Sequence, residues 1–133
     1  MAPLSWRPPD DGVIKVNTDA AVDSMNGKIG IGIIIRGSKG EVLAYSAQTI
    51  SVGFSSEIME SLAVFRGLVF ACDSSLLPCT IETDAHVVVN LINSGSVPLS
   101  DIGLIIHDIA QVLVCFPSCK VVFAFRLIWL LTA

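Results

Sequence analysis

Charged residues are scarce in this sequence. Asp, Glu, Lys and Arg make up only 15% of its 133 residues, whereas hydrophobic residues make up 53%. Basic residues are the scarcer kind, with eight Lys and Arg against twelve Asp and Glu, which leaves a net charge of -4. Neutralisation of phosphates by Lys and Arg supplies most non-specific affinity for nucleic acid, so this balance argues against tight binding through overall charge. Any contact with nucleic acid must be local.

Long apolar runs are also missing, despite the high hydrophobic content. The longest candidate, residues 121–131, has 11 residues and contains Arg126, whereas a membrane helix needs about 20 apolar residues. The N-terminus has no basic stretch followed by an apolar core, so we expect no secretory signal. We expect one domain with no membrane partner, inside the cell, in either the nucleus or the cytoplasm.

The four cysteines form no recognisable framework. Cys72 and Cys79 are separated by six residues, and Cys115 and Cys119 by three. These spacings fit neither the usual zinc sites nor a dense disulfide scaffold. Because free cysteines often lie in protein interiors, we interpret these four as small buried apolar residues or as bystanders, and we assign them no chemistry.

The spacing of apolar residues predicts an α/β protein. Alternation predicts strands, and a period near 3.6 predicts helices. The predicted strands cover residues 13–20, 28–36, 41–48, 79–83 and 120–125, and the predicted helices cover residues 55–73, 85–94 and 101–116. Short turns join the first three strands and long crossovers join the rest. The pattern therefore predicts a five-stranded mixed sheet, with three antiparallel strands and then two parallel ones, flanked by helices.

Three acidic residues lie where these elements would hold them still. Asp19 ends an apolar strand-like run, Glu60 lies inside the first predicted helix, and Asp84 closes the fourth predicted strand. Carboxylates on rigid elements are what a shared divalent metal requires. Each residue also has an ordinary interpretation. Asp84 fits a helix N-cap, Glu60 a solvated helix residue, and Asp19 a turn residue.

Neighbouring residues have less specific interpretations. Glu82 shares a strand face with Asp84, so it is a candidate for the metal environment, but a cross-strand partner is favoured. His86 falls in the first turn of a predicted helix, where we expect it to point to solvent with nothing to fix its tautomer. His107 is interpreted as a surface residue.

The order of strand Asp, helix Glu and strand Asp resembles the plant branch of the ribonuclease H family, in particular its stand-alone or reverse-transcriptase-associated domains in plant retroelements. The flanking residues carry this resemblance: Trp6-Arg7-Pro8-Pro9, Gly12, Lys15-Val16-Asn17-Thr18-Asp19-Ala20-Ala21, Met59-Glu60-Ser61-Leu62-Ala63 and Glu82-Thr83-Asp84. The match covers about residues 6–125. It implies a lead-in over residues 1–12, a ribonuclease H-like domain over residues 13–126 and a divergent apolar tail over residues 127–133.

The resemblance implies a monomeric enzyme that hydrolyses the RNA strand of an RNA–DNA hybrid. Such enzymes use two Mg²⁺ or Mn²⁺ ions held by carboxylates. Asp19 would bridge both ions, and Glu60 and Asp84 would bind one and position the attack. All three would therefore be catalytic residues and metal ligands. The hybrid would be recognised through the 2′-hydroxyls of its RNA strand. The resemblance does not indicate any protein partner.

The C-terminus departs from the family pattern. The family implies a fourth acidic ligand and a final helix after the fifth strand, but no Asp or Glu follows Asp108. We expect the final helix to be missing, as in a truncated or altered gene. Whether the chain is an enzyme is therefore open. It is either an RNA–DNA hybrid ribonuclease, with activity that the departure could impair, or a non-catalytic nucleic-acid-binding or scaffold domain of the same fold. A pseudogene product is a third interpretation.

Overall fold

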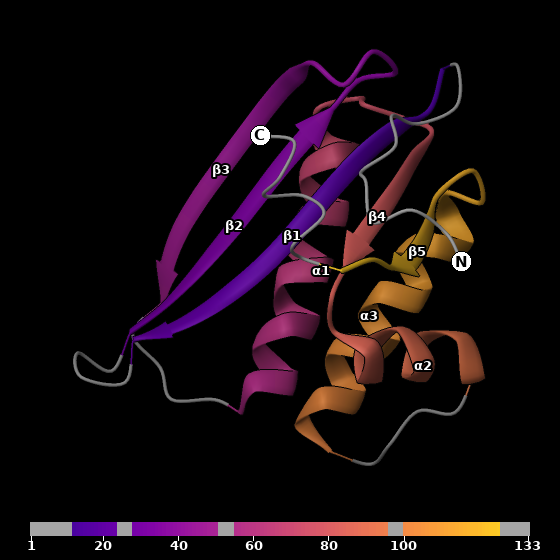
Figure 1. The fold of residues 1–133 in the computed structure, drawn as a ribbon. Coiled ribbons are helices and arrows are strands. Elements are labelled where there is room, and N and C mark those ends of the chain that lie inside the picture. The colour runs from indigo at the N-terminus through magenta and orange to yellow at the C-terminus, as the bar shows by residue number, and fades with distance from the viewer. Residues whose placement is uncertain (1–11, 24–27, 51–54, 96–99, 126–133) are drawn as a thin grey trace, which may run out of the picture.

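The chain forms an open sheet with helices packed against one of its faces (Figure 1). The computed structural model describes residues 12–23, 28–50, 55–95 and 100–125. The predicted lead-in falls almost wholly outside these ranges, as do the predicted apolar tail and the expected absence of a final helix.

The described elements follow the predicted order. The strands are β1 (Ile14–Asp23), β2 (Lys28–Arg36), β3 (Val42–Ile50), β4 (Cys79–Thr83) and β5 (Lys120–Phe123), and the helices are α1 (Ser56–Asp73), α2 (His86–Ser94) and α3 (Asp101–Cys115). Strand β1 runs three residues further than predicted because its pairing with β2 continues as far as Asp23 opposite Lys28. Strand β3 likewise continues to the end of its pairing with β2, and β5 ends two residues early.

The sheet has the strand order β3-β2-β1-β4-β5. Strand β2 pairs antiparallel with both β1 and β3, whereas β4 pairs parallel with both β1 and β5. This arrangement confirms the prediction of three antiparallel strands followed by two parallel ones. It also places the carboxyl end of β4 beside the middle of β1, because the pairing of these two strands ends at Asn17 opposite Glu82 while β1 continues to Asp23.

Helix α1 packs closely on β1 at Gly67, where the helix has no side chain. A Cβ built on Gly67 would lie 2.5 Å from Thr18 Cγ2 and 3.4 Å from Val16 Cγ1. Real Cβ atoms do not approach that closely, so this contact between α1 and β1 requires a glycine. The contact fixes the distance between α1 and the strand that carries Asp19.

The start of α1 is fixed by a side-chain cap. Ser55 is the N-cap residue, and its Oγ accepts a hydrogen bond from the backbone N–H of Ile58 at 3.3 Å. Such a cap stabilises a helix by about 1 kcal/mol. Because Glu60 lies in the second turn, the capped end sets where its carboxylate stands.

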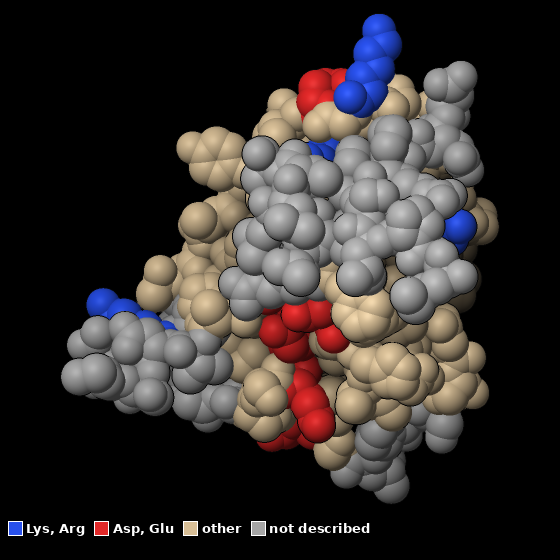
Figure 2. All heavy atoms as spheres, in the orientation of Figure 1, with Lys and Arg blue, Asp and Glu red and all other residues tan. Residues whose placement is uncertain are grey.

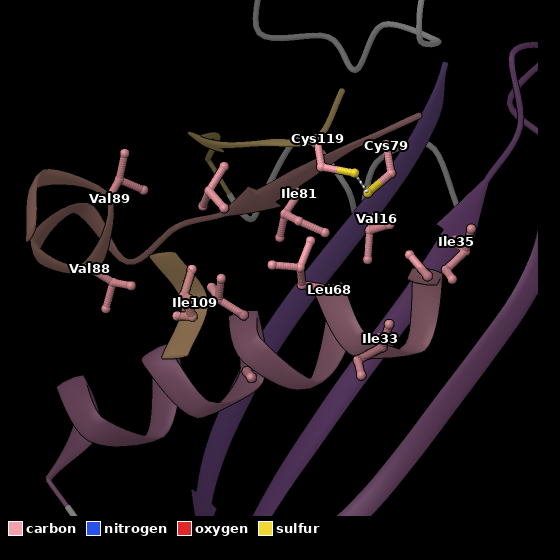
Figure 3. Packing of buried hydrophobic residues seen from close by; sticks show 14 of the residues in the cluster. Val16, Ile33, Ile35, Leu68, Cys79, Ile81, Val88, Val89, Ile109 and Cys119 are labelled. Carbon is pink, nitrogen blue, oxygen red and sulfur yellow. Dashed lines mark hydrogen bonds between the residues drawn. The ribbon is translucent and has the colours of Figure 1, made fainter. Parts of the chain in front are cut away.

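The core lies between the sheet and the helices (Figure 3). Apolar side chains of the central strands meet those of α1, α2 and α3, and the fully buried members include Val16, Ile33, Ile35, Leu68, Ile81, Val88 and Ile109. Burying a side chain of this size contributes about 1.5 to 3 kcal/mol. The core therefore holds α1 and the ends of β1 and β4 in one rigid unit.

Two of the cysteines belong to this core. Cys79, at the start of β4, and Cys119, just before β5, are buried as free thiols with their Sγ atoms 3.3 Å apart (Figure 3). Cys72 is half-buried and Cys115 is exposed. The interpretation as buried apolar residues is therefore confirmed for Cys79 and Cys119, whereas the exposed Cys115 fits the interpretation as a bystander.

None of the helices in the described ranges has the length and apolar character needed to cross a membrane.

Candidate metal site

The first two site residues follow the last paired residues of two parallel strands. The pairing of β1 with β4 ends at Asn17 opposite Glu82. Asp19 and Asp84 each come two residues later, Asp19 still within β1 and Asp84 directly after the last residue of β4. This matched register brings both carboxylates to the same part of the sheet.

Helix α1 adds the third carboxylate. One carboxylate oxygen from each of Asp19, Glu60 and Asp84 lies within 4.8 Å of the other two, and all three residues are half-buried. No other group of three His, Cys, Asp or Glu residues in the described ranges comes this close. We call these three residues the acidic cluster. Figure 2 shows a group of acidic side chains at the surface near the centre of this face, and the visible Lys and Arg side chains lie elsewhere on it.

The acidic cluster fits a hard divalent cation. Mg²⁺, Mn²⁺ and Ca²⁺ prefer oxygen ligands, and carboxylates are their usual protein donors. Three negative charges at this separation also repel one another, so a bound cation relieves an unfavourable interaction. The structure thus brings together all three residues that the sequence predicts as ligands.

The N-cap interpretation of Asp84 is wrong. The N-cap residue of α2 is Ala85, and no side chain caps this helix. Thr83 provides the local hydrogen bond instead, because its Oγ1 accepts from the backbone N–H of Ala85 at 3.2 Å. The Asp84 carboxylate therefore lies in the acidic cluster and does not cap α2.

The interpretation of Glu82 as a cross-strand partner is confirmed. Its side chain is buried, and its Oε2 lies 3.2 Å from Nζ of Lys15 on the neighbouring strand. Its Oε1 accepts a hydrogen bond from Nδ2 of Asn17 at 2.8 Å. Glu82 is thus held by β1 residues and is not part of the acidic cluster.

The expectation for His86 is half right. The side chain is exposed, but its ring does have partners. Nδ1 lies 3.3 Å from Nδ2 of Asn90, and the ring meets Phe123 edge to face with centroids 5.4 Å apart. A His and an Asn four residues apart on a helix form a pair that the sequence could have indicated. The contact with Phe123 depends on the fold and had no such signal.

The chain matches the profile of a known family over residues 17–128. That family is described as reverse transcriptase-like. The chain belongs to the reverse transcriptase-like family. The matched range contains the whole acidic cluster and all of β2 to β5. No curated protein matches the chain.

Solved structures of RNase H proteins share the fold of this reverse transcriptase-like chain. RNase H1 from Halobacterium salinarum superposes with a TM-score of 0.76 at 16% identity, over 86% of this chain and 87% of that one. The N-terminal RNase H domain of a Mycobacterium tuberculosis protein gives 0.73 at 18% identity, over 86% and 84%. LC11-RNase H1, isolated from compost and solved with an RNA/DNA hybrid, gives 0.71 at 21% identity, over 85% and 86%. These likenesses confirm the predicted ribonuclease H-like fold.

Proposed function

We propose that this chain is a ribonuclease H-type domain that binds RNA–DNA hybrids and hydrolyses their RNA strand. The observation that carries the proposal is the acidic cluster, in which three carboxylates from β1, α1 and the end of β4 lie within 4.8 Å of one another. The fold is that of RNase H1 proteins, and one of these, LC11-RNase H1, was solved with an RNA/DNA hybrid.

Asp19, Glu60 and Asp84 would hold the metal, and Mg²⁺ or Mn²⁺ is the ion that we propose. Two such ions supply an activated water and stabilise the leaving oxygen of a phosphodiester. The protein contributes by holding the carboxylates in place before substrate arrives. Glu60 is fixed by the capped start of α1, and the two Asp residues by the paired strands β1 and β4. The net charge of -4 gives the chain little general attraction for nucleic acid, so metal ions would also offset the negative site.

We also propose that activity is lower than that of a site with four carboxylates. Asp108 is the last acidic residue of the sequence, and no fourth carboxylate accompanies the acidic cluster within the described ranges. The motifs around the cluster support a plant, retroelement-associated origin. We propose a monomeric domain over residues 13–126, acting inside the cell in the nucleus or the cytoplasm.

The deciding experiment is cleavage of a labelled RNA–DNA hybrid by the purified chain in Mg²⁺ and in Mn²⁺. The variants are Asp19→Asn and Asp84→Asn, and the matched control is Asp108→Asn, which removes an exposed carboxylate from α3. We expect both cluster variants to lower the cleavage rate by about 100-fold or more, because each removes a charge that holds the metal, and the control to leave the rate unchanged.

Two results would count against this function. Cleavage that survives both cluster substitutions would mean a contaminating nuclease. If folded protein cleaves no hybrid with either metal, the proposed enzymatic activity is wrong. If that protein still bound the hybrid, the second candidate would hold, namely a non-catalytic nucleic-acid-binding domain. The observation that favours this second candidate is that, among the described residues, no fourth carboxylate joins the acidic cluster.

A further inference from the structure

A hollow of about 170 Å³ adjoins the acidic cluster, between the start of α1 and the start of α2. Glu60 belongs to both the cluster and the lining of this hollow. A substrate group next to a metal at the cluster would therefore lie beside the hollow. Among the described lining residues, His86 alone offers a side-chain nitrogen.

The partners of His86 fix which nitrogen can donate. Nδ1 faces Nδ2 of Asn90 at 3.3 Å. An amide nitrogen can only donate, so Nδ1 accepts and the neutral ring carries its hydrogen on Nε2. The edge-to-face contact with Phe123 holds the ring from another side, with an interplanar angle of 87°. The exposed ring is thus oriented, and Nε2–H is its remaining donor.

The strongest acceptor that Nε2–H could meet is an anionic oxygen, because hydrogen bonds to charged groups are stronger than those to neutral ones. Helix α2 begins at His86 and has no side-chain cap, so the partial positive charge of its first turn adds to the donor. Glu57 and Glu60 also line the hollow and would repel an anion, and Glu57, which is not part of the acidic cluster, gives an independent electrostatic test.

We propose that His86 donates a hydrogen bond from Nε2–H to a phosphate oxygen of the RNA strand, next to the phosphate that is cleaved. This inference rests on the proposed function, because the hybrid is what brings a phosphate to this place. The hydrogen bond uses the neutral ring and needs no change of protonation. His86 is therefore a substrate-binding residue that places the RNA strand over the acidic cluster.

The test is the dissociation constant of a labelled RNA–DNA hybrid, measured by fluorescence anisotropy at pH 8 in Ca²⁺, with a gel to show that the hybrid stays intact. His86→Phe keeps an aromatic ring against Phe123 but removes the donor, and His86→Gln restores an N–H of similar reach. The matched control is His107→Phe, which changes an exposed histidine on α3 away from the hollow.

We expect His86→Phe to raise the dissociation constant by about ten-fold, the effect of losing one hydrogen bond to a charged group. His86→Gln should stay within about three-fold of the unsubstituted chain, and His107→Phe should not change it. Glu57→Gln should tighten binding, because it removes a negative charge from the hollow. In ¹⁵N NMR spectra, the unsubstituted chain should show the Nε2–H tautomer, and Asn90→Ala should weaken that preference.

Failure of the inference can be told from failure of the proposed function. If the unsubstituted chain binds the hybrid and His86→Phe binds it equally well, the role of His86 is wrong while the hybrid-binding function stands. If His86→Gln loses as much affinity as His86→Phe, packing and not the donor matters, and the inference is also wrong. If the unsubstituted chain does not bind the hybrid, both proposals fall.

Discussion

Asn17 on β1 donates its Nδ2 hydrogen to Oε1 of Glu82 on β4, at a distance of 2.8 Å. The two residues form the last pair of the β1–β4 register, two positions before Asp19 and Asp84. Both side chains are buried, with 2% and 7% of their surface exposed. This hydrogen bond therefore ties the two strands together at the base of the acidic cluster.

The first prediction concerns this tie. Glu82→Gln keeps the shape of the side chain but removes the charge that pairs with Lys15 at 3.2 Å. Removing this buried charge breaks the ion pair with Lys15 and weakens the hydrogen bond from Asn17, so we expect the free energy of unfolding to fall by about 2 kcal/mol. Urea unfolding followed by circular dichroism measures this change. Asp108→Asn, an exposed carboxylate on α3, should change it by less than about 0.5 kcal/mol. Equal effects of the two variants would contradict a structural role for the Glu82 charge.

A second prediction follows from charge repulsion within the acidic cluster. Without a cation, three carboxylates within 4.8 Å destabilise the fold. Asp19→Asn should therefore raise the unfolding free energy of the metal-free chain by about 1 kcal/mol. Mn²⁺ at about 100 times its dissociation constant should raise that of the unsubstituted chain by about 2.7 kcal/mol. Thermal unfolding with and without Mn²⁺ measures both effects.

The same titration separates a metal site from a generally acidic surface. Asp19→Asn should lose most of the stabilisation by Mn²⁺, whereas Asp108→Asn should retain it, because only the first removes a member of the cluster. Equal responses from both variants would mean that Mn²⁺ screens surface charge without occupying a defined site.

A third prediction concerns Cys79. Burial, followed by the hydrogen bond with Cys119, raises the pKa of the Cys79 thiol well above its ordinary value of 9.0. Above pH 9 the unfolded chain loses this proton and the folded chain keeps it, so stability falls as pH rises. The fall approaches about 1.4 kcal/mol for each pH unit above 9. Urea unfolding at pH 8 and pH 10 should therefore show a loss that is smaller in Cys79→Ala. If the unsubstituted chain and Cys79→Ala lose the same stability between pH 8 and pH 10, the loss comes from groups other than Cys79.

The sequence indicated the members of the acidic cluster mainly through the flanking motifs that resemble the ribonuclease H family. Apolar periodicity placed Asp19 and Asp84 at strands and Glu60 on a helix, as the structure has them. The predicted mixed sheet, with three antiparallel strands and then two parallel ones, was also correct, because short turns and long crossovers leave few topologies open.

The errors arose where tertiary contacts decide the outcome. Asp84 has the local pattern of an N-cap, but its carboxylate lies in the acidic cluster and Ala85 takes the cap position without a side-chain bond. His86 has the pattern of a solvated residue, but Phe123 comes from a strand more than 30 positions away in the sequence. A single sequence contains no local signal for such contacts.

The last prediction concerns the close contact between α1 and β1. In most helices Gly→Ala is stabilising by about 1 kcal/mol, because alanine has the higher helix propensity. At Gly67 the added Cβ would lie 2.5 Å from Cγ2 of Thr18, a fully buried side chain that has little room to move. Overpacking of this kind costs about 1 to 3 kcal/mol. We therefore expect Gly67→Ala to lower the unfolding free energy by about 1 kcal/mol, measured by urea unfolding.

Gly30→Ala on β2 is the matched control, because a Cβ at that position meets no atom within 4 Å and its partner on β1 is Ala21. It should leave stability unchanged or raise it by about 0.5 kcal/mol. The two variants should also differ at the acidic cluster. Thr18 precedes Asp19, so a shift of β1 away from α1 would move Asp19 relative to Glu60 and weaken Mn²⁺ binding in Gly67→Ala alone. If Gly67→Ala is destabilised but its Mn²⁺ affinity is unchanged, the added Cβ is accommodated without moving Asp19. The contact between α1 and β1 would then not set the geometry of the acidic cluster.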